Sequence, residues 1–198
     1  MWRWVKRFIE RIKMFIRRLL FQLPFRGHSP CAPPYEPQQW NDGGEIQRMN
    51  NCYNYACNIQ NNTFARPGQG SDSPFPPPYN PRTGMGGYNC DDVSAAAIAD
   101  GLVPVRRDEV CFHCCFKVAL VIRLFDPNNP KSGIDFHWLR HDDNGRWSQK
   151  GGRGAATDKD NAGRQIDAPE NALRNGRLNR YNQFCGYFCI CRDRVRIA

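Results

Sequence analysis

The sequence predicts an α+β domain in which short helices precede a small antiparallel sheet. Two helical patterns lie in the first part of the domain and four strand patterns follow them. Helices that come before strands, instead of alternating with them, are typical of this class. The chain has 198 residues, enough for one domain of ordinary size. We divide it into a helical segment, 1–26, a linker, 27–41, and a domain, 42–198.

Residues 1–26 predict a basic amphipathic helix. Apolar side chains recur every three or four residues on one face: Val5, Phe8, Ile9, Ile12, Phe15, Ile16, Leu19, Leu20 and Leu23. The segment holds eight Lys and Arg and one Glu, a net charge of +7. We expect residues 1–25 to lie on an anionic membrane surface. A partner's groove and packing on the chain's own domain are the alternatives.

The rest of the chain is nearly neutral. Its 172 residues hold 20 basic and 18 acidic side chains, a net charge of +2 out of the total of +9. A domain without a basic excess is not expected to bind nucleic acid. Charges recur up to Arg18 in the terminal segment, so neither a simple signal peptide nor a conventional transmembrane helix is predicted there.

Proline and glycine divide the domain. The linker 27–41 and a loop over 66–87 are rich in both residue types. Between them, Asn50 or Asn51 is a suitable N-cap for a short helix. A second helix is predicted over Cys90–Asp100, because acidic residues occupy its first turn and a glycine follows its end.

Four strands are expected in the second half of the chain. They are rich in branched and aromatic residues and cover Phe116–Phe125, Ile134–Arg140, Arg146–Lys150 and Gln183–Arg192. Asn144 and Gly145 predict a hairpin turn between the second and the third strand. The polar stretch Gly151–Arg180 is expected to be mostly loop.

Cys52 and His137 are the candidate catalytic pair. A thiol attacks a carbonyl as thiolate, and a helix N-terminus or a nearby imidazole lowers its pKa. Cys52 follows the expected asparagine cap, and His137 lies within a predicted strand between aromatic residues. Gln149, 12 residues after His137, is the candidate for orienting the imidazole. The alternatives for this third position are Asp158, Asp160 and, more weakly, Ser148.

This order of residues resembles the papain-like cysteine hydrolases, and among them the bacterial cell-wall endopeptidase and amidase branch of NlpC type. The resemblance is carried by Asn51–Ala56, by Asp135–Arg140 and by Gly145–Lys150. It implies a nucleophile helix packed on a small antiparallel sheet, with Cys52 as nucleophile, His137 as base and Gln149 as orienting residue. In similar uncharacterised bacterial sequences a histidine stands where this chain has Gln149.

The other nine cysteines allow three states. Cys111 and Cys114 have zinc-ligand spacing, and Cys185, Cys189 and Cys191 form a second cluster that would complete a metal site. Disulfides between the clusters are favoured if the protein is exported, and buried free thiols are expected if it is not. No cofactor is assigned.

Two functions are therefore expected. The first is a thiol-dependent hydrolase that cleaves an amide bond, in a peptide or a peptidoglycan-like substrate, at a membrane surface. The alternative is a non-catalytic protein, membrane-active or partner-binding, with a Cys-rich scaffold domain. The expected location is the membrane periphery or outside the cell.

Overall fold

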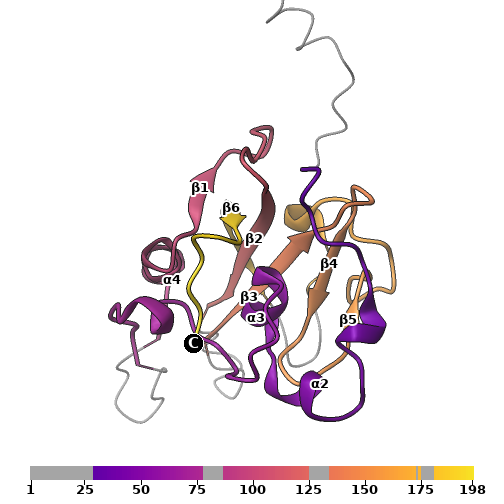
Figure 1. The fold of residues 1–198 in the computed structure, drawn as a ribbon, viewed down its shortest axis with the longest axis horizontal. Helices are drawn as coiled ribbons and strands as arrows, with labels where there is room; N and C mark the ends of the chain where they lie inside the picture. Colours follow the sequence, from indigo (N-terminus) through magenta and orange to yellow (C-terminus); the bar gives the residue numbers. More distant parts are fainter. Residues whose placement is uncertain (1–28, 78–86, 125–133, 173, 175–180) are drawn as a thin grey trace, which may run out of the picture.

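The computed structural model describes residues 29–77, 87–124, 134–172, 174 and 181–198. Six strands form one antiparallel sheet in the order β1-β6-β2-β3-β4-β5 (Figure 1). The strands are β1 (Val103–Val105), β2 (Cys115–Arg123), β3 (Asp135–His141), β4 (Trp147–Lys150), β5 (Ala156–Thr157) and β6 (Gln183–Cys191). The helices are η1 (Pro37–Gln39), α2 (Glu45–Met49), α3 (Cys52–Cys57), η2 (Gln69–Ser71), α4 (Cys90–Ala99) and η4 (Pro169–Asn171). None of these described helices is long and apolar enough to cross a membrane.

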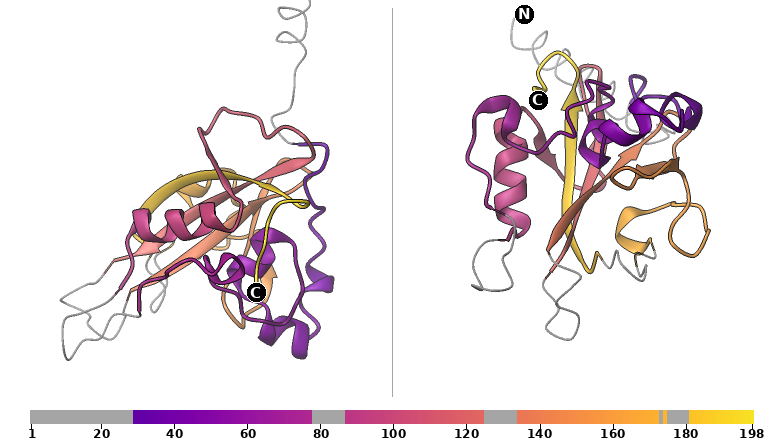
Figure 2. Two further views of the ribbon diagram at one scale, coloured as in Figure 1. Left: turned by 60° about the vertical axis from the view of Figure 1, so that its left-hand side comes forward. Right: turned by 90° about the horizontal axis from the view of Figure 1, so that it is seen from below.

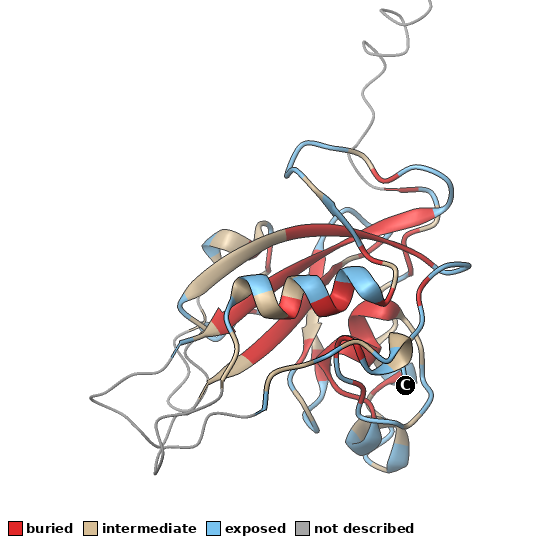
Figure 3. Ribbon diagram, turned by 90° about the vertical axis from the view of Figure 1, so that its left-hand side faces the viewer, coloured by how far each residue is buried: buried red, intermediate tan, exposed pale blue. Residues whose placement is uncertain are grey.

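The main core lies between the sheet and the helices α3 and α4. Strand β2 is buried over all of its residues except the last, as Figure 3 shows for the centre of the sheet. Alternate residues of a strand point to opposite faces, and Val118, Leu120 and Ile122 share this core with Tyr53 of α3 and Val93 of α4. Strand β2, between β6 and β3, therefore supplies the centre of this core.

A second, smaller core covers the other face of the sheet. Here Val121 and Leu139 pack with Trp147, Ile166 and Tyr187. Figure 2 shows α4 on one side of the strands and the segment that follows β5 on the other. Burial on both faces explains why β2 is a nearly continuous apolar sequence.

The segment before α2 is held against the domain by Arg140 on β3. The guanidinium of Arg140 donates to Asp142 Oδ1 at 2.8 Å, to Asn58 Oδ1 at 2.9 Å and to the Pro34 carbonyl at 3.2 Å. Its exposed fraction is 1%. A buried guanidinium is tolerated because its N–H groups are paired in this way.

Several sequence predictions are confirmed at the level of single elements. Helix α4 occupies the range predicted for the second helix, and Asn51 is the N-cap of α3. Strands β2, β3, β4 and β6 match the four predicted strands to within a few residues. The short strands β1 and β5 were not predicted. The basic helix expected over 1–26 lies outside the described residues.

The predicted fold class, an α+β domain of papain-like type, is wrong. The main element of the domain is a six-stranded antiparallel sheet, and the helix that begins at Cys52 has six residues. Asn58 ends that helix in the left-handed conformation, with φ at 56°, so no long nucleophile helix can form. The short helix packs its side chains into the core instead: all six of its residues are buried.

Candidate functional site

Four disulfides connect distant parts of the chain, and they account for eight of the ten cysteines. The pairs are Cys31–Cys114, Cys90–Cys185, Cys111–Cys189 and Cys115–Cys191, with sequence separations of 83, 95, 78 and 76 residues. Every cysteine proposed as a zinc ligand is thus part of a disulfide. The described residues include no cluster suited to a metal ion. Several disulfides in one domain are typical of a protein that folds outside the cytosol.

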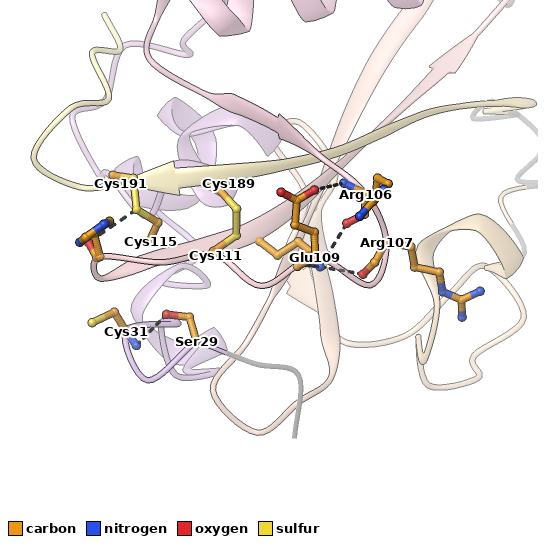
Figure 4. The surroundings of a disulfide bond; sticks show 11 residues. Ser29, Cys31, Arg106, Arg107, Glu109, Cys111, Cys115, Cys189 and Cys191 are labelled. Carbon is orange, nitrogen blue, oxygen red and sulfur yellow. Dashed lines mark hydrogen bonds between the residues drawn. A yellow bond between two sulfur atoms is a disulfide. The ribbon is translucent and has the colours of Figure 1, made fainter. Parts of the chain in front are cut away.

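Two of the disulfides lie side by side at one end of the sheet. Figure 4 shows the Cys111–Cys189 and Cys115–Cys191 bonds between β2, β6 and the loop that leads into β2. Lys117 fixes the same loop, because its ammonium donates to the carbonyls of Arg107 at 2.7 Å and Glu109 at 2.5 Å. The loop before β2 is therefore held both by covalent bonds and by hydrogen bonds.

Cys52 is a buried thiol at the first position of α3. The Asn51 side chain accepts from the N–H groups of Tyr53 and Asn54, which caps the helix as the sequence predicts. The Cys52 sulfur lies 4.0 Å from the Phe136 carbonyl oxygen, and its exposed fraction is 5%. Burial raises the pKa of Cys52 to about 12. At neutral pH the side chain is a thiol and not a thiolate.

His137 and Gln149 lie in contact on neighbouring strands. The register of β3 and β4 pairs Leu139 with Gln149, and His137 is two residues away on the same face. His137 Nε2 is 2.9 Å from Gln149 Oε1, and Gln149 Nε2 donates to the Lys159 carbonyl at 2.7 Å. Because that donation fixes the Gln149 amide, the imidazole carries its proton on Nε2.

The His137 ring is enclosed. It stacks on Tyr181 with ring centroids 5.1 Å apart, and burial lowers the pKa of His137 below its usual 6.5. A cavity of about 150 Å³ lies next to the ring and is lined by His137, Gln149, Gly151, Thr157, Asn161, Arg174 and Tyr181. A neutral imidazole in this setting can exchange a proton, but it presents no permanent charge.

The structure brings two of the three predicted site residues together. Within the described part of the chain no hydrogen bond joins the Cys52 thiol to the His137 ring; each has another partner. The alternatives for the third position have other partners. Ser148 forms a hydrogen bond with Tyr55, and Asp158 accepts one from Gln165. Asp160 forms a salt bridge with Arg164. The catalytic roles given to Cys52, His137 and Gln149 stay predictions.

Lys150 is a buried cation near Cys52 that the sequence did not single out. Its ammonium donates to the carbonyls of Gln47 at 2.6 Å, Asn50 at 2.5 Å and Gly152 at 2.8 Å. Burial lowers the pKa of Lys150 to about 8, so it is charged at neutral pH. Lys150 thereby joins β4 to the turn between α2 and α3, and a lysine that ends a strand gives no signal of this in the sequence.

Comparison with known proteins gives one informative match. The chain is 38% identical over 160 residues to insoluble matrix shell protein 1 of Ruditapes philippinarum, and the match covers 81% of this chain and 91% of that protein. No family model and no solved structure matches the chain.

This match corrects the resemblance to papain-like hydrolases of NlpC type. The relative is a shell matrix protein, so the assignment as a thiol protease is wrong. The Cys-rich scaffold, which was the alternative, agrees with both the match and the four disulfides. More than nine-tenths of the relative is covered at an identity well above 30%. The chain therefore belongs to the family of insoluble matrix shell protein 1.

Proposed function

We propose that the protein is a non-catalytic structural component of an insoluble extracellular matrix. The observation that carries the proposal is the match to insoluble matrix shell protein 1, which spans nearly the whole of that protein. A match over 160 residues is too long to rest on an isolated motif. The name of the relative supplies the class of material, a shell matrix.

The disulfides support a structural role. Each one joins residues at least 76 positions apart, so each closes a long loop of the chain. In the chain-entropy account, closing a loop of this length stabilises the folded state by about 4.5 kcal/mol. A matrix component stays outside the cell without repair or replacement, and covalent cross-links suit that setting.

The state of Cys52 supports the absence of thiol catalysis. A thiol nucleophile needs a lowered pKa and access to its substrate. Cys52 has neither, because it is buried and its pKa is raised to about 12. Its position at a capped helix start therefore serves packing in the proposed role.

The basic segment 1–25 is the proposed attachment element. Its expected apolar face and the net charge of +7 over residues 1–26 suit an anionic membrane surface, as proposed from the sequence. Co-sedimentation of the full chain with vesicles of phosphatidylserine and phosphatidylcholine, compared with vesicles of phosphatidylcholine alone, tests this element. Replacing Arg7, Arg11 and Arg18 with Gln lowers the net charge of residues 1–26 from +7 to +4 and is expected to reduce the difference between the two vesicle types.

Fractionation of the producing tissue tests the matrix role. An antibody against the domain is used to follow the protein through a buffer extract, a detergent extract and the residue that neither dissolves. The proposal predicts that most of the protein stays in the extracellular residue. Recovery of most of the protein in the buffer extract, with its cysteines reduced, would contradict the proposal.

A further inference from the structure

Asn61, Asn62 and Thr63 form an acceptor sequence for N-linked glycosylation. The motif requires an asparagine followed two positions later by serine or threonine, with any residue except proline between them. Asn61-Asn62-Thr63 is the one place in the 198-residue sequence where this pattern occurs. In a protein that stays in the cytosol the pattern has no consequence, but the four disulfides indicate export.

The motif lies in an exposed turn. It follows α3, whose C-cap is Asn58, and both Asn61 and Thr63 are exposed. Asn62 takes the left-handed conformation with φ at 59°, and the chain bends at this residue. A turn on the surface can hold a bulky, hydrated group without displacing the core.

The two functional side chains are in contact. The Thr63 hydroxyl donates to Asn61 Oδ1 at 2.8 Å. The reacting atom, Asn61 Nδ2, donates one hydrogen to the Ile197 carbonyl at 3.1 Å, and this hydrogen bond is exposed. A carboxamide nitrogen has two hydrogens, so one remains for another bond.

From the motif, its exposure in the folded domain and the export that the disulfides indicate, we propose that Asn61 is the attachment site of an N-linked oligosaccharide. The donor class is a lipid-linked oligosaccharide diphosphate. A bond forms between Asn61 Nδ2 and C1 of the first sugar, the C1–oxygen bond to the diphosphate breaks, Nδ2 loses one proton, and the lipid diphosphate leaves. The reaction needs no oxidant or reductant.

The folded structure tolerates the modified side chain. Asn61 Oδ1, which accepts from Asn54 Nδ2 at 2.7 Å and from Thr63, is unchanged by the reaction. The N–H that remains on Nδ2 can still donate to Ile197. The contacts that connect this turn to α3 and to the C-terminal segment are therefore compatible with a glycan. The inference rests on export and not on the matrix role.

The test is expression of the full chain behind a cleavable secretion signal in insect cells. Protein in the medium and protein retained in the secretory compartment are pooled, because oligosaccharide transfer precedes folding. The pool is treated with a peptide-N-glycosidase in ¹⁸O-water and analysed by gel and by peptide mass spectrometry. We expect one downward gel shift and conversion of Asn61 to ¹⁸O-labelled Asp.

Three variants separate the motif from the fold. Thr63→Val keeps the size of the side chain and removes the hydroxyl, and Asn61→Gln removes the acceptor; both are expected to lose the gel shift. Thr63→Ser retains the motif and is expected to keep the shift. An unmodified Asn61 in the wild-type pool overturns the proposal, and so does a shift that survives in both Thr63→Val and Asn61→Gln. Neither outcome bears on whether the protein enters a matrix.

Discussion

Cys115 and Cys191 lie directly opposite each other on β2 and β6 and are joined by a disulfide. The strand pair that carries the core is therefore held by main-chain hydrogen bonds and by a covalent bond at one end. Cys189, two residues before Cys191, bonds to Cys111 and pairs with Val103 of β1. The end of β6 is thus connected to β1, to β2 and to the loop before β2.

Removing this disulfide is expected to destabilise the domain without changing its fold. The double variant Cys115→Ala/Cys191→Ala, which leaves no new free thiol, should lower the free energy of unfolding by about 2–4 kcal/mol. Urea unfolding followed by tryptophan fluorescence measures the change. The matched control is Cys57→Ala, at a buried cysteine that is not in a disulfide. It tests whether any replacement of a buried cysteine by alanine has the same effect. An unchanged urea midpoint in the double variant would show that the bond does not support the sheet.

Replacing Lys150 with Met is expected to cost about 2–4 kcal/mol. Methionine fills a similar volume but leaves three carbonyls, those of Gln47, Asn50 and Gly152, without their donor. Lys159→Met is the control, because that side chain is half exposed and lies 3.9 Å from Asp158. Urea unfolding at pH 7 should separate the two variants clearly. Equal midpoints would mean that the buried ammonium is not needed by the turn between α2 and α3.

The buried His137 is expected to make stability fall in mild acid. Its pKa is below 6.5 in the folded state, so the unfolded chain binds a proton first as the pH decreases. The contribution is therefore fully present above pH 6.5 and is lost as the pH falls towards the folded-state value. Each unit of difference between the two pKa values corresponds to about 1.4 kcal/mol.

Comparing unfolding at pH 7 and pH 5 in two histidine variants isolates this contribution. His137→Asn removes the buried titrating group and should reduce the loss of stability between the two pH values. His113→Asn changes an exposed histidine and should leave the loss as it is in the wild type. If both variants behave like the wild type, the acid sensitivity arises elsewhere in the protein.

The sequence predicted single elements well because their signals are local. Acidic residues in the first turn and a following glycine mark α4, and a run of branched residues marks β2. The place of β6 between β1 and β2 is set by pairing between residues that are far apart in the chain. Neither hydrophobic period nor turn residues specify that order, and the fold class was wrong for this reason.

The candidate site, too, was predictable where the signal is local and not where it depends on distant parts of the chain. The spacing of 12 residues between His137 and Gln149 suits a hairpin, and the register of β3 and β4 places the two side chains in contact. The burial of Cys52 could not be predicted from its asparagine cap. A cap residue indicates where a helix begins, but it does not indicate which segments pack over that helix. The disulfide pairing could not be predicted from the sequence either, since eight cysteines allow 105 connectivities.

The central claim is that the protein is a disulfide-bonded scaffold without a catalytic thiol. Determining the state of all ten cysteines by alkylation tests this claim. The native protein is treated with iodoacetamide between pH 6 and pH 8, then unfolded without reductant, labelled with a second reagent and mapped by peptide mass spectrometry. We predict no labelling in the native state, labelling of Cys52 and Cys57 after unfolding, and eight cysteines in the four observed disulfides. Rapid labelling of Cys52 alone below pH 7, slowed by His137→Ala, would contradict the account.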